Sequence, residues 1–150
     1  MRRAIELSRY AVSQGDGGPF GCVIVRDGEI AGEGWNRVVG RNDPTAHGEM
    51  EAIRDASGRL GTFELKGCDL YTSAQPCPMC LAAIYWARID RVFYGNTVED
   101  AAAIGFDDVA IREEVVRPPG DRTIPEVPLL RDEANEVFRT FAADPDRVRY

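Results

Sequence analysis

The stretch Pro76-Cys77-Pro78-Met79-Cys80 follows the short segment Cys68-Asp69-Leu70-Tyr71-Thr72 and opens a segment that extends to Arg88. Proline is common in the first turn of a helix, because its missing N–H would have no helical partner there. We therefore expect a strand at 68–72, a helix that ends at Arg88 and a further strand at 90–94. A strand, a crossover helix and a second strand form a parallel pair, so this stretch indicates an α/β fold.

The residues before this unit predict antiparallel pairing. Asp27-Gly28 is a hairpin signal between a strand at 20–25, which is rich in β-branched residues, and a second strand at 29–39. Residues 4–14 have the apolar periodicity of a helix. The sheet is therefore expected to be mixed, with both antiparallel and parallel neighbours.

Three further helices are expected. Asp43-Pro44-Thr45 has the features of a helix start, a capping residue and an early proline, and predicts a helix from 46 to 57 that stops at Gly58. A short helix is expected at 97–103 and a final one at 132–143, after a connector at 113–128 that carries four prolines. The 150 residues are predicted to form a single domain.

The charge balance limits the classes of partner. The chain carries 18 basic and 25 acidic residues, a net charge of −7 at pH 7. Proteins that bind nucleic acid usually present a basic face, because contacts to phosphate supply most of their affinity. A small neutral substrate is therefore favoured over nucleic acid. No apolar run approaches the ~20 residues of a membrane helix, and the N-terminus lacks a signal peptide's apolar core. We expect a cytoplasmic protein without a membrane partner.

One histidine and two cysteines have the spacing of a metal site. His47 is the only histidine of the chain, and Cys77 and Cys80 are three residues apart near a predicted helix start. Positions i and i+3 of a helix face the same way, and the helix N-terminus favours thiolates. One nitrogen and two sulfur ligands leave the fourth position of a tetrahedral zinc ion open for water, as in catalytic zinc sites. The sequence therefore predicts one Zn²⁺ per subunit.

Glu49 is the predicted catalytic residue. It lies two residues after His47, about 200° around a helix, so the two side chains point in different directions. A carboxylate in that position faces the water on the metal rather than the metal itself. Because zinc lowers the pKa of its water toward ~7, Glu49 is expected to take up and return protons.

Two other interpretations of the cysteines stay open at this point. A structural zinc site needs four ligands, so Cys22 or Cys68 would have to complete it. A redox C-x-x-C pair would leave His47 and Glu49 without a role. In the catalytic interpretation, which we prefer, Cys22 and Cys68 are buried packing thiols.

The pattern H-x-E followed by P-C-x-x-C is the documented signature of zinc deaminases. Residues 43–49 and 73–80 of this chain resemble the bacterial guanine deaminases of the cytidine-deaminase superfamily. The resemblance continues at 83–88, 105–108 and 122–125, and it reaches the terminal Tyr150. The zinc motif is shared by the superfamily, whereas the later segments point to guanine deaminases.

The resemblance implies a three-layer α/β/α fold around a central five-stranded mixed sheet. It also implies a homodimer in which a C-terminal segment, residues ~130–150, swaps to cover the active site of the partner subunit. The implied reaction is the hydrolysis of guanine to xanthine and ammonia, with zinc as cofactor and a small free base as substrate.

The resemblance also implies a set of substrate-binding residues. These are Phe20, Asn36, Ala46, Gly48, Trp86, Asp108 and Tyr150. Phe20 matches a base-stacking aromatic, Asn36 an amide that hydrogen-bonds the base, and Asp108 an acid that reads ring nitrogens or assists proton transfer. Trp86 matches a pocket aromatic, and Tyr150 a terminal tyrosine that reaches into the pocket. On their own, the two aromatics Phe20 and Trp86 are equally compatible with core packing, and Asn36 with a turn.

Two departures from the family leave the substrate open. Gln75 stands where the family commonly has glutamate, and Gly48 stands where alanine is usual. Both lie close to the expected pocket, so cytosine, a pterin, an aminotriazine or a nucleoside such as guanosine are alternative substrates. A protein of another class, a non-catalytic zinc-stabilised binding module, is the remaining alternative, and the presence of Glu49 argues against it.

Overall fold

The computed structural model describes residues 1–149. These residues form two compact units, residues 1–113 and the chain from Glu114 onward, and each is described by itself. The first unit contains, in chain order, α1 (Arg2–Gln14), β1 (Gly21–Arg26), β2 (Glu29–Trp35), α2 (Val38–Arg41), α3 (Gly48–Leu60), β3 (Cys68–Ala74), α4 (Pro78–Trp86), β4 (Arg91–Asn96) and α5 (Val98–Ala103). Within residues 1–149, no helix is long and apolar enough to cross a membrane.

The second unit is helical. Helix α6 (Asp108–Val116) begins in the first unit and ends in the second, which continues with the 3₁₀ helix η1 (Pro119–Asp121) and with α7 (Arg131–Ala143). Apolar residues of α7 are exposed, among them Val137 and Phe138. Residues 114–149 therefore present an apolar helix face that they do not themselves cover.

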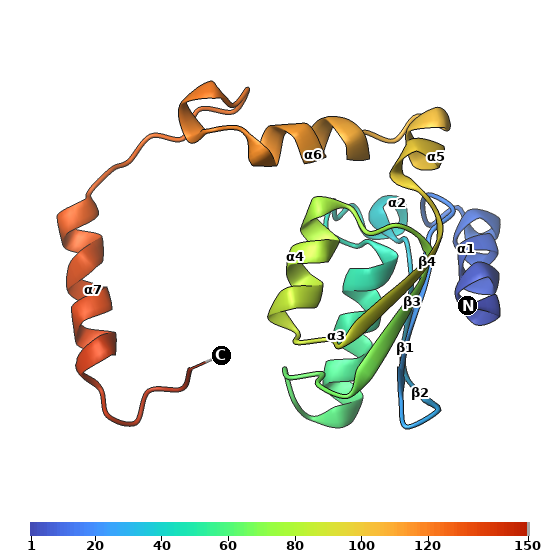
Figure 1. The fold of residues 1–150 in the computed structure, drawn as a ribbon, viewed down its shortest axis with the longest axis horizontal. Helices are drawn as coiled ribbons and strands as arrows, with labels where there is room; N and C mark the ends of the chain where they lie inside the picture. The colour runs from blue at the N-terminus through green and yellow to red at the C-terminus, as the bar shows by residue number, and fades with distance from the viewer. Residues whose placement is uncertain (150) are drawn as a thin grey trace. The chain divides into compact units, whose positions relative to one another are not determined.

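A mixed sheet organises the first unit, in the strand order β2-β1-β3-β4. Strand β1 runs antiparallel to β2 and to β3, whereas β3 and β4 are parallel and are joined by α4. Helix α1 covers one face of the sheet, and α3 and α4 cover the other (Figure 1). The predicted α/β class, the hairpin at Asp27-Gly28 and the mixed pairing are confirmed.

The alternation of β1 explains the two layers of helices. Cys22 and Ile24 point toward α3 and α4 and pack in a core that includes Leu70 of β3. Val23 points to the other face and packs against Ala4 and Leu7 of α1. Because neighbouring residues of a strand face opposite sides, a strand that is buried on both faces is apolar throughout.

The expected fifth strand is not found among residues 1–149, where the sheet has four strands. After β4 the chain continues in helices and in a segment with prolines at 118, 119, 125 and 128. Proline has no N–H to donate to a neighbouring strand, so such a segment is a poor candidate for a sheet. The five-stranded sheet that the family resemblance implied is therefore wrong for the described chain.

Strand β2 and helix α3 also have other bounds than predicted. Strand β2 ends at Trp35, and the residues expected to complete it form the short helix α2 instead. Helix α3 begins at Gly48 rather than Ala46, because the Asp43 side chain accepts hydrogen bonds from the N–H and hydroxyl of Thr45 and so closes a local turn. The helix passes through the exposed Gly58, the expected stop, and ends before Gly61.

Helix α3 lies unusually close to β2. A Cβ atom added at Gly32 would lie 2.6 Å from the Ala52 carbonyl oxygen, and one at Gly34 would overlap the backbone of Gly48 and Ala52. No rotation of a side chain relieves an overlap with backbone. Glycine at these two positions of β2 therefore sets how near the sheet the start of α3 can lie.

We predict that Gly34→Ala lowers the free energy of unfolding by about 3 kcal/mol, the upper part of the range for overpacked cores. Gly58→Ala is the matched control on α3 itself, because a Cβ there has nothing within 4 Å. It should raise the free energy of unfolding by roughly 0.5–1 kcal/mol through better helix propensity. Urea denaturation of the three proteins measures both effects. A Gly34→Ala protein as stable as the wild type would contradict the close approach.

Candidate metal centre and adjoining pocket

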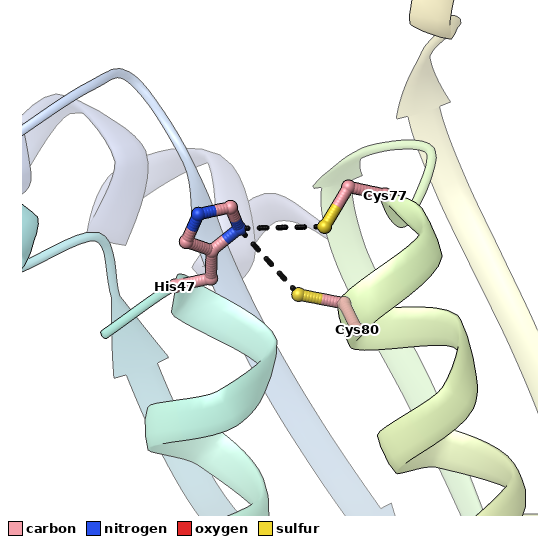
Figure 2. A group of neighbouring side chains, drawn as sticks. All are labelled: His47, Cys77 and Cys80. Atoms are coloured by element: carbon pink, nitrogen blue, oxygen red, sulfur yellow. Dashed lines mark hydrogen bonds between the residues drawn. The ribbon is translucent and has the colours of Figure 1, made fainter. Parts of the chain in front are cut away.

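The start of α3 and the start of α4 bring three metal-ligand residues together (Figure 2). His47 is the residue that precedes the first turn of α3, and Cys77 has the same position in α4, where Pro78 follows as the first helical residue. Cys80 lies in the first turn of α4. Helix N-termini carry partial positive charge, so this arrangement favours thiolates over thiols.

The three ligand atoms have the spacing of a metal site. His47 Nδ1 lies 3.6 Å from Cys77 Sγ and 3.6 Å from Cys80 Sγ, and the three atoms lie within 4.8 Å of one another. Ligands of a tetrahedral zinc ion with ordinary Zn–N and Zn–S bonds are about 3.5 Å apart. Both sulfur atoms are buried, Cys77 at 7% and Cys80 at 0% exposure. The donor set therefore fits zinc with one position open.

Hydrogen bonds among His47, Cys77 and Cys80 shift the pKa of all three side chains. Hydrogen bonds from Cys80 and His47 lower the pKa of Cys77 to about 4 despite its burial. The pKa of His47 is raised, chiefly by its hydrogen bond to Cys77. The pKa of Cys80 is raised because its thiol donates to Cys77 and is itself buried. A metal ion displaces such shared protons when it binds, which couples metal affinity to pH.

Glu49 lies beside the cluster without belonging to it. It is in the first turn of α3 and is 6% exposed, and its Oε1 accepts a hydrogen bond of 3.0 Å from the Thr72 hydroxyl of β3. Burial raises the pKa of the Glu49 carboxyl group, and the hydrogen bond from Thr72 opposes this shift only in part. The side chain thus combines burial, a fixed partner and a position next to the ligands.

A cavity of about 370 Å³ opens in front of these side chains. Its size is within the range of small-molecule sites. The lining residues all belong to the first unit and come from the loop before β1, the segment that follows β2, the end of β3, the starts of α3 and α4, and the start of α6 with the residues before it. They are Gly17, Gly18, Phe20, Asn36, Val38, Val39, Pro44, His47, Glu49, Ala74, Gln75, Cys77, Phe106 and Asp108.

Two phenylalanines form an aromatic wall of the cavity. The rings of Phe20 and Phe106 meet edge to face, with centroids 4.7 Å apart and planes at 83°. Gly18 lies against both rings, because a Cβ there would be 2.6 Å from Phe106 and 2.8 Å from Phe20. Edge-to-face packing of this kind holds an aromatic ring in one orientation.

Asn36 and Asp108 supply polar groups to the same cavity. Asn36 is 4% exposed, and its Oδ1 accepts a hydrogen bond of 3.2 Å from the Val38 N–H at the start of α2. Asn36 therefore makes a turn and lines the cavity at once. Burial, and then the nearby Cys77, raise the pKa of Asp108. The cavity thus offers an amide and a carboxyl group beside an aromatic wall.

An ion pair joins the segment between β2 and α3 to α3, and a backbone hydrogen bond stabilises the segment itself. The Glu51 carboxylate is buried, and Arg41 and Arg54 each approach it to 2.8 Å. The backbone N–H of Arg37 donates a hydrogen bond of 2.8 Å to the backbone carbonyl oxygen of Ala46. These contacts hold the part of the cavity wall that Val38, Val39 and Pro44 contribute.

The structure brings together seven of the residues singled out from the sequence. His47, Glu49, Cys77, Phe20, Asn36 and Asp108 line the cavity, and Cys80 joins the ligand cluster behind it. Ala46 and Gly48 are buried beside His47 but do not line the cavity, and Trp86 is 61% exposed at the end of α4. Tyr150 lies outside the described residues.

Some cavity residues were not singled out from the sequence. Phe106 lies in the segment 105–108 that resembles the family, and an aromatic residue two positions before Asp108 is the sequence signal for it. Val38 and Val39 were assigned to a strand, whereas they belong to α2. Within residues 1–149, Cys22 and Cys68 are not part of the ligand cluster. They are buried in the core with Ile24 and Leu70, as packing thiols would be.

Known proteins match the chain over its full length. The family model described as the cytidine and deoxycytidylate deaminase zinc-binding region matches residues 1–96. Guanine deaminase of Bacillus subtilis (strain 168) is 54% identical over 150 residues, which cover 100% of this chain and 96% of that protein. A tRNA-specific adenosine deaminase of Agrobacterium fabrum is 45% identical over 146 residues, with 94% of this chain and 90% of that protein covered.

Solved structures of guanine deaminases are also similar to this chain. The crystal structure of guanine deaminase from Bacillus subtilis has a TM-score of 0.95 at 48% identity, and the match covers 99% of this chain and 95% of that one. A structure of guanine deaminase from Nitrosomonas europaea has a TM-score of 0.66 at 30% identity, with 95% and 82% covered. The chain therefore belongs to the cytidine and deoxycytidylate deaminase family of zinc enzymes, within the group of the bacterial guanine deaminases.

Proposed function

We propose that the protein hydrolyses guanine to xanthine and ammonia. The observation that carries this proposal is the cavity, in which Glu49 and the ligands His47 and Cys77 face the same space as Phe20 and Asn36. The full-length similarity to Bacillus subtilis guanine deaminase supports guanine as the base.

Three side chains would hold the zinc ion: His47 through Nδ1, and Cys77 and Cys80 through their sulfur atoms. In a three-ligand site zinc supplies a Lewis acid that lowers the pKa of water in its open position toward ~7. The protein contributes the burial of the ligands and the two helix N-termini that favour their anionic forms.

Glu49 carries the protons of the reaction. Hydrolysis forms a C–O bond at the carbon that bears the amino group and breaks the C–N bond there. Glu49 takes the two protons of the water molecule in turn, and it delivers the first to the neighbouring ring nitrogen and the second to the amino group, which leaves as ammonia. Burial raises the pKa of Glu49, which suits a group that accepts and returns protons near neutral pH.

The remaining cavity residues bind and orient the base. Phe20, held edge to face by Phe106, offers a flat apolar surface to the ring. The Asn36 amide and the Asp108 carboxyl group hydrogen-bond the polar edge of the base. Ala46 and Gly48 flank His47 outside the cavity lining, so any contact of theirs to the base is through backbone groups.

We further propose a homodimer in which residues ~130–150 cross to the partner subunit, with Trp86 and Tyr150 in the completed site. Two sets of exposed apolar residues support this assembly. Tyr85 and Trp86 of α4 are 71% and 61% exposed, and Phe138 and Phe141 of α7 are 73% and 53% exposed. Large apolar patches of this kind are rarely left open to water.

A cytoplasmic location and a free base as substrate complete the proposal. All four cysteines are free thiols, the state that a reducing compartment maintains. Because the chain is similar to tRNA-specific adenosine deaminases, tRNA is the second candidate substrate. The net charge of −7 disfavours it, because binding a polynucleotide depends on basic contacts to phosphate.

The first prediction concerns the proton carrier. Ammonia release is measured from guanine, guanosine, cytosine, a pterin, an aminotriazine and a tRNA transcript. We expect release from guanine, and a loss of about 10²–10⁴-fold in kcat for Glu49→Gln with zinc content unchanged. Glu29→Gln, on the exposed start of β2, controls for the change of charge. Release from another substrate alone would refute guanine as the substrate, and no release from any substrate would favour a binding module.

The second prediction concerns the ligands. Cys80→Ser should reduce zinc from about one equivalent per chain to a small fraction, because two of three protein ligands hold zinc poorly. Cys68→Ala should retain zinc, since Cys68 lies outside the ligand cluster. Elemental analysis of both variants after dialysis gives the zinc content. A Cys68→Ala protein without zinc would indicate a four-ligand site instead.

The third prediction tests the swap by complementation. A chain with Glu49→Gln keeps its tail but lacks the proton carrier, and a chain without residues 146–150 keeps Glu49 but lacks the tail. Each should be inactive alone with zinc bound. Refolded together, they should recover activity at about a quarter of the sites, those at which an intact tail covers an intact Glu49. No recovery, or a monomer by light scattering, would contradict the swap.

A further inference from the structure

A buried hydroxyl group lies in the apolar core directly behind the proposed proton carrier. Thr72 of β3 is 1% exposed and pairs with Cys22 on β1. It shares its face of the strand with Cys68 and Leu70, which pack with α3 and α4. By the pattern of this face, an aliphatic side chain is expected at position 72.

Among residues 1–149, the hydroxyl group has one hydrogen-bond partner, which is Glu49. Thr72 Oγ1 donates to Glu49 Oε1 at 3.0 Å, and both residues are buried. Valine has the same shape as threonine and would fill this place without any polar group to satisfy. Because a buried hydroxyl is costly unless it is hydrogen-bonded, core packing alone does not account for threonine here.

The hydrogen bond fixes how the carboxylate is turned. A carboxylate has two oxygen atoms, and rotation about its last torsion is broad when nothing holds it. Thr72 engages Oε1 from β3 and so restrains the rotation of the carboxylate beside the cavity that Glu49 lines. A proton carrier has to lie within hydrogen-bond distance of each atom that it serves, so its orientation bears directly on the rate.

We propose that Thr72 is a positioning residue for catalysis, which holds the Glu49 carboxylate in the orientation for proton transfer. The inference rests on the proposed deamination and adds a residue to it. If Thr72 had a purely structural role, a different result would be expected. If the hydroxyl only satisfied a buried carboxylate, its loss would lower stability and leave the turnover of folded enzyme unchanged.

Two substitutions separate these roles in the full-length, zinc-loaded protein. Thr72→Val keeps the shape and removes the donor, whereas Thr72→Ser keeps the donor. We expect Thr72→Val to lower kcat for guanine by roughly ten- to a hundredfold, the value of a hydrogen bond to a charged group, with KM and zinc content near those of the wild type. Thr72→Ser should recover most of this loss.

The adjacent Ser73 is the matched control. Its hydroxyl faces the opposite side of β3, accepts a hydrogen bond from the Gly21 N–H at 3.0 Å and lies outside the cavity lining. Ser73→Ala should lower the thermal midpoint and leave kcat unchanged. In a Glu49→Gln background, Thr72→Val should have no further effect on the residual rate, because Thr72 acts through Glu49.

The outcomes distinguish this inference from the proposed function. A Thr72→Val enzyme with the wild-type kcat overturns the inference alone, as does a Thr72→Ser enzyme that is equally impaired. A fall in kcat that follows a loss of zinc also overturns it. A wild-type protein that releases no ammonia from guanine overturns the proposed function, and the inference with it.

Discussion

The structure depends on the meeting of two helix starts beside the sheet. His47 precedes α3 and Cys77 precedes α4, so the backbone turn that starts each helix also places a ligand. Their positions are set by the sheet, since Gly34 lets α3 lie against β2, and β3 leads through residues 75–77 into α4. A shift of either helix would separate atoms that now lie within 4.8 Å of one another.

The same arrangement accounts for the chemistry of the cavity. Glu49 follows His47 by two residues, so the element that supplies a ligand also supplies the proposed proton carrier. Its burial raises its pKa, and the sheet supports it from behind through Thr72. The opposite wall comes from loops and from the start of α6, which bring Phe20, Phe106 and Asp108 to the cavity. In the proposed mechanism the helices and the sheet therefore carry the reaction, and the loops carry recognition.

The sequence predicted the parts that local spacing determines. The ligands and Glu49 follow from a short motif, and the hairpin follows from Asp27-Gly28. The rest depends on distant contacts. The Asp43 side chain closes a turn instead of capping α3, Phe106 becomes part of the wall by packing on Phe20, and no fifth strand forms within residues 1–149. Neither periodicity nor composition contains that information.

Zinc K-edge X-ray absorption on the full-length protein tests the central claim most directly, because it reports the atoms bound to the metal. With His47, Cys77 and Cys80 as the ligands, the spectrum should show two sulfur atoms at about 2.3 Å and lighter nitrogen or oxygen atoms at about 2.0 Å. Three or four sulfur atoms would place Cys22 or Cys68 on the metal. That result would contradict an open catalytic position and, with it, the proposed hydrolysis.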